Sequence, residues 1–371
     1  MYEREIRSYV KIDLDKFVNN LNRLSEHVKP ARLVLVLKAD GYGHGAYELA
    51  KTALENGYDF FAVAFTSEGV ELRKKGIKGR ILILNYTDDS EWEDILKYEL
   101  IPTIHDRESL NALRRTTKKR ITVHVNVDTG MGRLGYRVEE SADFIKEVVR
   151  TEKLEGLYTH FAAADERDKR YTRYQYSRFL SLLKQLKDEG IDIPIIHTNN
   201  SAAAIDLPEY ANDYVRVGIA IYGLYPSEEV NKDLVELEAI LSWYSIVSFV
   251  KTIHEGDSIG YGREYIAKEE RRIATIPIGY ADGYSRMLSN NAFVLIGGKK
   301  CPVVGRVSMD QITVDVTDVS EVRKGDECVL IGKQKDEEIT ADEMAKWRKT
   351  INYEVTCNIS NRVPRIYVKN K

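Results

Sequence analysis

Cysteine and long apolar runs are scarce in this chain of 371 residues, and their scarcity excludes several classes of protein. Cys301, Cys328 and Cys357 show no metal-site or disulfide spacing, which is typical of a reducing compartment. No apolar run approaches the length that spans a bilayer, and residues 1–5 lack the apolar stretch of a signal peptide. We therefore expect a cytoplasmic protein with no metal and no membrane contact of its own. The sequence leaves open that the chain is the cytosolic domain of a longer membrane protein.

An excess of charge of one sign is also missing. The net charge is −3, while 30% of residues are charged and 43% are hydrophobic, as in an ordinary globular protein. This balance gives no indication of nucleic-acid binding. The length exceeds that of a typical single small domain and predicts two domains, each able to bury a full core.

Residues 1–235 alternate short apolar strands with amphipathic helices, the first helix being expected at 13–28 behind a possible cap, Asp13. Eight strands in this alternation predict an N-terminal (β/α)8 TIM-type barrel, an α/β fold whose working residues project from the C-terminal strand ends. A doubly wound sheet is the alternative, but it usually has fewer strands. The predicted strands are 33–38, 60–65, 80–85, 101–105, 122–128, 154–160, 195–200 and 214–222.

Residues 236–371 show a different rhythm, of strands separated by glycine turns, which predicts a C-terminal, mostly antiparallel β domain. A helix is expected at 340–350, and Gly297-Gly298 is a candidate hairpin turn. The predicted strands are 241–253, 272–278, 292–296, 301–307, 311–316, 327–331 and 357–368.

Lys38 follows the apolar run 33–37 and precedes the glycine-rich segment 39–45. A desolvated lysine loses its proton easily and can form a Schiff base, the chemistry of an enzyme that uses pyridoxal 5'-phosphate (PLP). Taken alone, a strand-end lysine that reaches the surface is the more common interpretation. The other segments of the chain decide between the two.

Eight short segments stand in a fixed order along the chain. They are Lys38 with its glycine loop, 128–133, 158–161, 197–202, 216–218, 260–262, 279–284 and 305–310. As a set they resemble alanine racemases, which are PLP-dependent enzymes of fold type III, and the resemblance covers residues 12–367. No single segment is specific, whereas the whole set is.

The resemblance implies four catalytic residues. Racemisation removes a proton from one face of the substrate Cα and supplies one to the other, so two acid/base groups must flank it. Lys38, which binds PLP as an internal aldimine, matches one of them, and Tyr261, supplied by the partner subunit of a homodimer, matches the other. A free phenol with a pKa near ~10 is a poor base. His160 and Arg216 match the residues that polarise it through hydrogen bonds.

The resemblance also implies the cofactor contacts. Tyr42, Ser201, Gly218 and Ile219 match the site of the PLP phosphate, where hydroxyl and backbone N–H groups suit an anion. Arg216 matches the residue that faces the pyridine nitrogen. Because arginine keeps its proton, it leaves that nitrogen unprotonated, which favours racemisation over transamination.

Two residues match the substrate-binding positions of the family. Arg133 matches a residue near the PLP phenolic oxygen and the substrate carboxylate, and Met309 matches a backbone donor to that carboxylate from the partner chain. Both roles are anion recognition. With Tyr261 and Met309 acting in trans, the active form is expected to be a homodimer that shares its sites between subunits.

The chain departs from the family pattern at two positions. Asn126 stands where many relatives have a carbamylated lysine, and we hypothesise that a small anion such as chloride fills the gap beside Arg133. Asn361 stands where alanine racemases typically have tyrosine near the substrate methyl group. A smaller amide leaves room for a hydroxymethyl group and can hydrogen bond it. This change resembles the serine racemases associated with vancomycin resistance, and it predicts activity on serine as well as alanine.

Three alternatives stand beside this interpretation. A strict alanine racemase would ignore serine. A PLP-dependent decarboxylase of basic amino acids would pair the pyridine nitrogen with a carboxylate, which Arg216 argues against. A non-catalytic PLP-binding barrel would need neither Tyr261 nor the C-terminal domain. Production of D-amino acids for peptidoglycan is implied by the resemblance alone.

Overall fold

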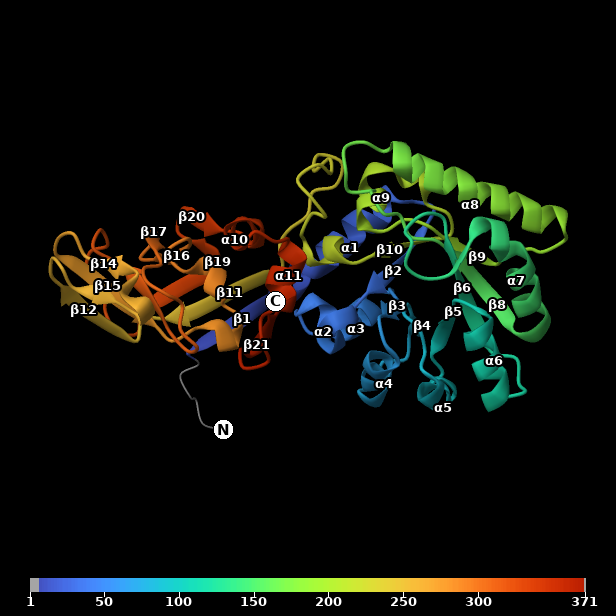
Figure 1. Cartoon of the computed structure of the whole chain (residues 1–371), viewed down its shortest axis with the longest axis horizontal. Helices are drawn as coiled ribbons and strands as arrows, with labels where there is room; N and C mark the ends of the chain where they lie inside the picture. The colour runs from blue at the N-terminus through green and yellow to red at the C-terminus, as the bar shows by residue number, and fades with distance from the viewer. Residues whose placement is uncertain (1–6, 370–371) are drawn as a thin grey trace. The chain divides into compact units, whose positions relative to one another are not determined.

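The computed structural model describes residues 7–369, so residues 1–5, considered above for a signal peptide, lie outside the described part. The described residues form two compact units (Figure 1). The barrel unit comprises Lys16–Gly41 and Ala46–Glu238. The strand unit comprises the described residues up to Asp15, the segment Tyr42–Gly45 and the residues from Ala239 onward. The expected domain boundary at residue 235 stays a prediction.

The barrel unit contains the predicted ring of eight parallel strands, in the order β10-β2-β3-β4-β5-β6-β8-β9, with the short strand β7 paired to β6. Two backbone hydrogen bonds join β9 to β10 and nearly close the ring, from Asp213 N to Ile196 O (3.0 Å) and from Arg216 N to Asn199 O (2.9 Å). The prediction of a TIM-type barrel is confirmed. The strands are β2 (Arg32–Val36), β3 (Phe60–Val63), β4 (Arg80–Ile83), β5 (Ile101–Ile104), β6 (Thr122–Asp128), β7 (Tyr136–Arg137), β8 (Lys153–Tyr158), β9 (Ile195–His197) and β10 (Tyr214–Val217).

Amphipathic helices connect the barrel strands. The first begins at Leu14, directly after Asp13, whose Oδ1 accepts a hydrogen bond from Asp15 N (3.1 Å) as an N-cap does. Its apolar side chains, such as Phe17 and Leu21, are fully buried. The helices are α1 (Leu14–His27), α3 (Ala46–Glu55), α4 (Thr66–Lys74), α5 (Trp92–Lys97), α6 (Arg107–Thr116), α7 (Val138–Thr151), α8 (Arg170–Asp188) and α9 (Ser201–Asp206).

The strand unit is mostly antiparallel, as predicted. Its largest sheet has the order β17-β16-β19-β11-β1-β21, with β20 paired to β19, and β12-β15-β18 form a second sheet. Only β1 and β21 run parallel within these sheets. The strands are β1 (Ser8–Asp13), β11 (Leu241–Ile246), β12 (Phe249–Ile253), β13 (Ser258–Ile259), β14 (Tyr265–Ile266), β15 (Arg271–Ile276), β16 (Phe293–Ile296), β17 (Lys299–Pro302), β18 (Ile312–Asp315), β19 (Glu327–Gln334), β20 (Glu337–Ile339) and β21 (Arg365–Val368).

Two local predictions in the strand unit are confirmed. Helix α10 (Ala341–Arg348) lies inside the expected range and begins after Thr340, whose Oγ1 accepts a hydrogen bond from Glu343 N (3.0 Å). Gly297 and Gly298 connect β16 to β17, and Ile296 pairs with Lys299 across the turn. Both glycines have positive φ, as a tight hairpin requires.

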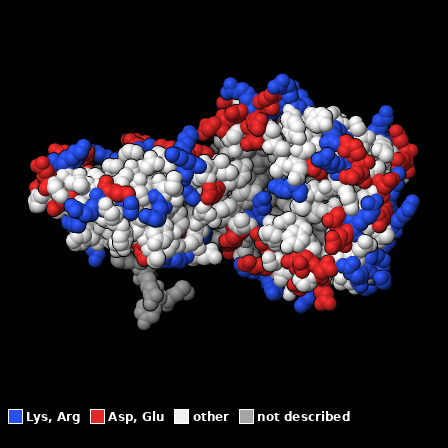
Figure 2. Space-filling view, viewed as in Figure 1, with Lys and Arg blue, Asp and Glu red and all other residues white. Residues whose placement is uncertain are grey.

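Several predicted strands differ in the structure. The expected strand 241–253 is two strands, β11 and β12, which belong to different sheets, and the expected strand 301–307 ends at Pro302. The expected strand 357–368 is wrong in its first half, because helix α11 (Asn352–Cys357) ends where the strand was predicted to begin, and only β21 is extended. The expected strand 214–222 ends at Val217, since the 3-10 helix η3 (Ile219–Tyr222) follows Gly218. Surface charges of both signs are interspersed over the visible face of each unit (Figure 2).

Candidate active site at the C-terminal ends of the barrel strands

Lys38 lies two residues beyond the last residue of β2, not within the strand as predicted. It is half-buried and begins the short segment α2 (Lys38–Tyr42), whose interior is left-handed. The φ angles are 52° at Ala39, 50° at Asp40, 63° at Gly41 and 54° at Tyr42. Each such angle at a residue other than glycine costs roughly 1 kcal/mol. The chain therefore adopts a strained turn directly after the lysine.

Arg216, on β10, lies at the centre of a dense hydrogen-bond network and is only 4% exposed. Burial lowers its pKa to about 10, and the charge of Arg133 acts in the same direction, so the guanidinium remains a cation at neutral pH. Its two Nη groups donate to groups that follow or end strands β8 and β9. Nη1 contacts His197 O (2.6 Å) and His197 Nδ1 (3.0 Å), and Nη2 contacts Thr159 O (2.7 Å), Thr198 O (3.1 Å) and His160 Nδ1 (3.2 Å).

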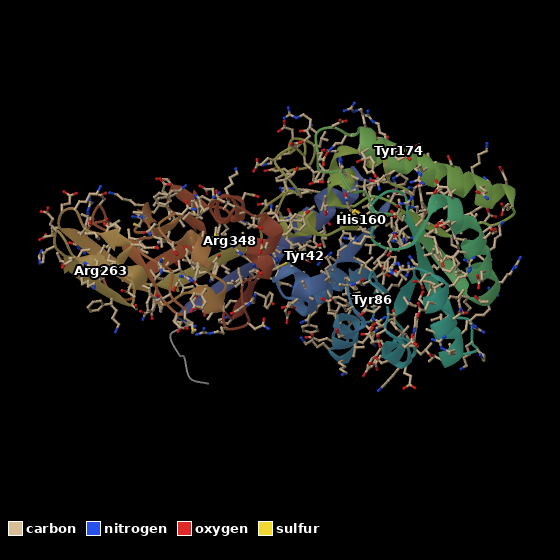
Figure 3. The ribbon with its side chains drawn as sticks, viewed as in Figure 1. Tyr42, Tyr86, His160, Tyr174, Arg263 and Arg348 are labelled. Atoms are coloured by element: carbon tan, nitrogen blue, oxygen red, sulfur yellow. The ribbon has the colours of Figure 1, made fainter. Side chains whose placement is uncertain are left out.

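His160, labelled in Figure 3, follows β8 in the barrel unit. Its contact with Arg216 fixes it in one tautomer. Because a guanidinium can only donate, His160 Nδ1 must accept, and Nε2 then carries the proton of the neutral ring. Burial keeps the pKa of His160 well below its usual value, and the charges of Arg216, Arg133 and Lys38 add to this effect. His160 is therefore a neutral imidazole with a single N–H donor at pH 7.

A second chain of hydrogen bonds runs from Arg216 into the barrel interior. His197 Nδ1 accepts from Arg216, so His197 Nε2–H donates to His124 Nδ1 (2.9 Å). His124 Nε2–H in turn donates to Glu155 Oε2 (3.1 Å), which also accepts from Arg80 Nη2 (2.6 Å). Arg80 is the first residue of β4 and Glu155 lies in the first half of β8, so the chain extends towards the N-terminal ends of the strands. The sequence analysis did not identify His124, Glu155 or Arg80.

The two interior histidines predict a pH dependence of stability. His124 and His197 are fully buried, and burial lowers the pKa of both. A histidine with a lowered folded pKa binds more protons when unfolded, so its contribution to stability is present above its unfolded pKa and is lost as pH falls. Below about pH 6.5, we expect each to reduce the free energy of unfolding by about 1.4 kcal/mol per pH unit.

Urea unfolding at several pH values between about 7 and 5 measures this slope. His197→Asn should make the slope shallower by the contribution of one histidine. An equal slope in the wild type and in His197→Asn would contradict the assignment of a neutral, buried His197.

The residues predicted to hold the PLP phosphate are compatible with an anion. Ser201 Oγ accepts from Gly218 N (2.9 Å), so its own hydroxyl hydrogen is directed elsewhere and remains a donor. Ser201 begins α9, capped by Asn200, while Ile219 begins η3. Tyr42 belongs to the strand unit, and burial raises the pKa of its phenol, so it stays a neutral O–H donor.

Arg133 and Asn126 lie on or just after β6 in the barrel unit. Arg133 is exposed, in a loop held by Asp128, whose Oδ1 accepts from Gly130 N (2.9 Å) and Gly132 N (3.0 Å). Asn126 Nδ2 donates to Leu134 O (2.7 Å), and within residues 7–369 its buried Oδ1 has no partner. One of the two N–H groups of the Asn126 amide is thus used by the backbone, and the hypothesis of a small anion beside Arg133 stays a prediction.

The remaining predicted residues lie in the strand unit and are exposed. Tyr261, which follows Gly260, is 71% exposed, Met309 is 52% exposed, and Asn361 is also exposed. The structure therefore brings His160 and Arg216 together, and likewise Ser201 and Gly218, within the barrel unit.

Comparison with known proteins gives concordant results for sequence and structure. Sequence-family profiles described as "Alanine racemase, N-terminal domain" and "Alanine racemase, C-terminal domain" match residues 12–226 and 240–367. An alanine racemase of Halothermothrix orenii is 45% identical over 370 residues, covering 98% of this chain and 97% of the relative. "Alanine racemase 2" of Bacillus subtilis is 42% identical, covering 97% and 94%.

Two solved structures are also similar over nearly the whole chain. An alanine racemase of Clostridium difficile 630 has a TM-score of 0.94 at 40% identity, covering 99% of this chain and 97% of the other. An alanine racemase of Bacillus anthracis, with bound L-Ala-P, has a TM-score of 0.93 at 39% identity, covering 100% and 97%.

Proposed function

The chain belongs to the alanine racemase family, a family of PLP-dependent amino-acid racemases, and from this premise we propose that it interconverts L- and D-alanine and also accepts serine. The observation that carries the proposal is the buried cation Arg216 in contact with the neutral His160 at the C-terminal strand ends. A decarboxylase of the same fold would place a carboxylate where this arginine lies.

In the proposed mechanism the protein holds the cofactor and moves protons. PLP, when bound, supplies an electron-withdrawing ring that acidifies the substrate Cα–H. Lys38 Nζ takes or returns the proton on one face of Cα, and the hydroxyl of Tyr261 from the partner subunit does so on the other. Ser201, Tyr42 and the backbone N–H groups of Gly218 and Ile219 bind the phosphate.

Other residues are proposed to contact the ring nitrogen of PLP, the phenol of Tyr261 and the substrate carboxylate. Arg216 donates a hydrogen bond to the ring nitrogen without giving up its proton, so the ring does not become a strong electron sink. His160 presents its single N–H, on Nε2, to the phenol oxygen of Tyr261. Arg133 and the backbone N–H of Met309 bind the substrate carboxylate.

We propose a homodimer as the active form. Tyr261 and Met309 are both large side chains that are more than half exposed in the single chain. Both side chains are thus accessible to a partner subunit, where the resemblance implies that they act. A cytoplasmic location stays a prediction from the composition of the sequence. Supply of D-amino acids to peptidoglycan and a link with vancomycin resistance stay predictions from the resemblance.

Racemisation of L-alanine by the PLP-loaded protein tests the central proposal. Exchange of the Cα proton in deuterated water, with appearance of D-alanine, is expected. Binding of PLP without exchange would instead indicate a non-catalytic PLP-binding barrel, and loss of the substrate carboxyl group would indicate a decarboxylase.

Asn361→Tyr tests the serine activity. If the amide hydrogen-bonds a hydroxymethyl group, the tyrosine variant should lose roughly 10-fold or more in kcat/KM for L-serine while keeping its kcat/KM for L-alanine within about threefold. The two substrates are measured side by side on wild type and variant. Poor serine turnover in both proteins would identify a strict alanine racemase.

A further inference from the structure

The strained turn after Lys38 depends on neighbouring groups to hold it. Within the turn, Gly41 N donates to Leu37 O (2.8 Å), and Asp40 Oδ1 accepts from Ala46 N (2.8 Å), at the first residue of α3. Neither bond reaches another strand of the barrel. Three of the four left-handed residues carry side chains, so this backbone is costly and contacts from outside the turn help to hold it. Leu37 N, just before the turn, donates to Ala62 O (2.8 Å), next to Glu68's own donors after β3.

Glu68, in the first turn of α4, the helix that follows β3, supplies one such contact. Its Oε1 accepts from Ala39 N (2.6 Å), the backbone N–H directly after Lys38. Its Oε2 accepts from Ala64 N (2.7 Å) and Phe65 N (3.1 Å), where the chain leaves β3 for α4. One half-buried carboxylate thus joins the chain after β2 to the chain after β3 through three backbone donors.

We propose that Glu68 is a positioning residue for Lys38, an inference that rests on the proposed role of this lysine. The Ala39 N–H belongs to the peptide group formed with the Lys38 carbonyl, so a bond to it fixes the plane of that peptide. The plane sets the direction of the Lys38 Cα–Cβ bond and hence where Nζ reaches. Proton transfer at Cα depends steeply on this position, because a misplacement of about 1 Å can lower a rate by up to about 100-fold.

A carboxylate is the side chain that suits three donors. Both of its oxygens accept and neither donates, whereas a glutamine amide offers one acceptor oxygen and an NH₂ group that opposes a backbone N–H. Glu68→Gln can therefore satisfy Ala39 or the Ala64 and Phe65 pair, but not all three. Glu68→Ala removes every one of these bonds.

Glu71 provides a matched control on the same helix. It has the same side chain, is exposed, and pairs with Lys75 Nζ (2.7 Å) on the surface. Glu71→Gln therefore removes one carboxylate from α4 while leaving the three backbone bonds of Glu68 in place.

Two measurements test the proposal, one on the protein without cofactor and one on the PLP-loaded enzyme. Amide hydrogen exchange over residues 37–42 in the cofactor-free protein should accelerate about tenfold or more in Glu68→Ala, less in Glu68→Gln, and not in Glu71→Gln. In the loaded enzyme, kcat for L-alanine should fall by about 10-fold to 100-fold in Glu68→Ala, with KM within about twofold. The kcat of Glu68→Gln should lie between those of Glu68→Ala and the wild type.

The outcomes separate failure of this inference from failure of the proposed function. Wild-type exchange and wild-type kcat in both Glu68 variants would overturn the positioning role. Absence of racemisation in the wild type would overturn the proposed function, while the exchange measurement would still show whether Glu68 holds the turn. If Glu68→Ala does not fold, Glu68→Gln, which keeps the size of the side chain, carries the test.

Discussion

Lys38→Ala is expected to lower kcat for L-alanine by about 10⁴-fold or more and to abolish covalent attachment of PLP. The variant loses the amine that is proposed both to bond the cofactor and to act as the base on one face of Cα. The same substitution at Lys75, a surface lysine paired with Glu71 in the barrel unit, should leave kcat unchanged. Borohydride reduction followed by peptide mass mapping locates the modified lysine.

Retention of a reducible PLP adduct at another lysine, with substantial racemisation, would contradict the assignment of Lys38. Residual PLP binding without activity would not, because the phosphate contacts proposed for Ser201 and Gly218 remain in the variant.

Tyr261→Phe is expected to lower kcat by about 10³-fold, because the ring is kept and only the hydroxyl proposed to serve the second face of Cα is removed. Tyr265→Phe, a nearby tyrosine of the strand unit, should retain wild-type kcat. Racemisation of each enantiomer is followed separately by circular dichroism.

Mixing inactive subunits tests whether Tyr261 acts in trans. Random exchange between Lys38→Ala and Tyr261→Phe dimers gives half mixed dimers with one intact site in two, so about a quarter of wild-type activity should return. No recovery after verified subunit exchange would mean that both groups serve the site of their own chain.

Much of the barrel could be predicted from sequence because its strands are buried runs of apolar residues. Runs such as 33–37 and 80–85 differ from amphipathic helices in periodicity, and all eight strands lie where this pattern places them. The apolar pattern does not define where the strands end. The strand expected to reach Lys38 ends at Val36, because the left-handed turn that follows is fixed by Glu68, a residue distant in sequence.

The hydrogen-bond chain behind Arg216 could not be predicted from the sequence. His124, Glu155 and His197 lie on three different strands, and only the register of the parallel sheet places them in line. Strand β1 was also missed, because its alternating pattern of buried and half-buried residues directly precedes the stronger helical pattern of α1. Helix α11 has six residues, which is too short for helical periodicity to be recognised, so the sequence does not predict it.

Because of the position of β1, the largest sheet of the strand unit can be completed only after nearly the whole chain has been synthesised. It is the first described strand to leave the ribosome, yet it lies in the sheet between β11 and β21, which begin at Leu241 and Arg365. The barrel strands mostly pair with strands that are close in sequence. The barrel can therefore form before β11 and β21, the partners of β1, have been synthesised. A fragment that begins at residue 236 would leave the inner edges of β11 and β21 unpaired and prone to aggregate. Any attempt to produce the C-terminal part alone must therefore carry residues 8–13 with it.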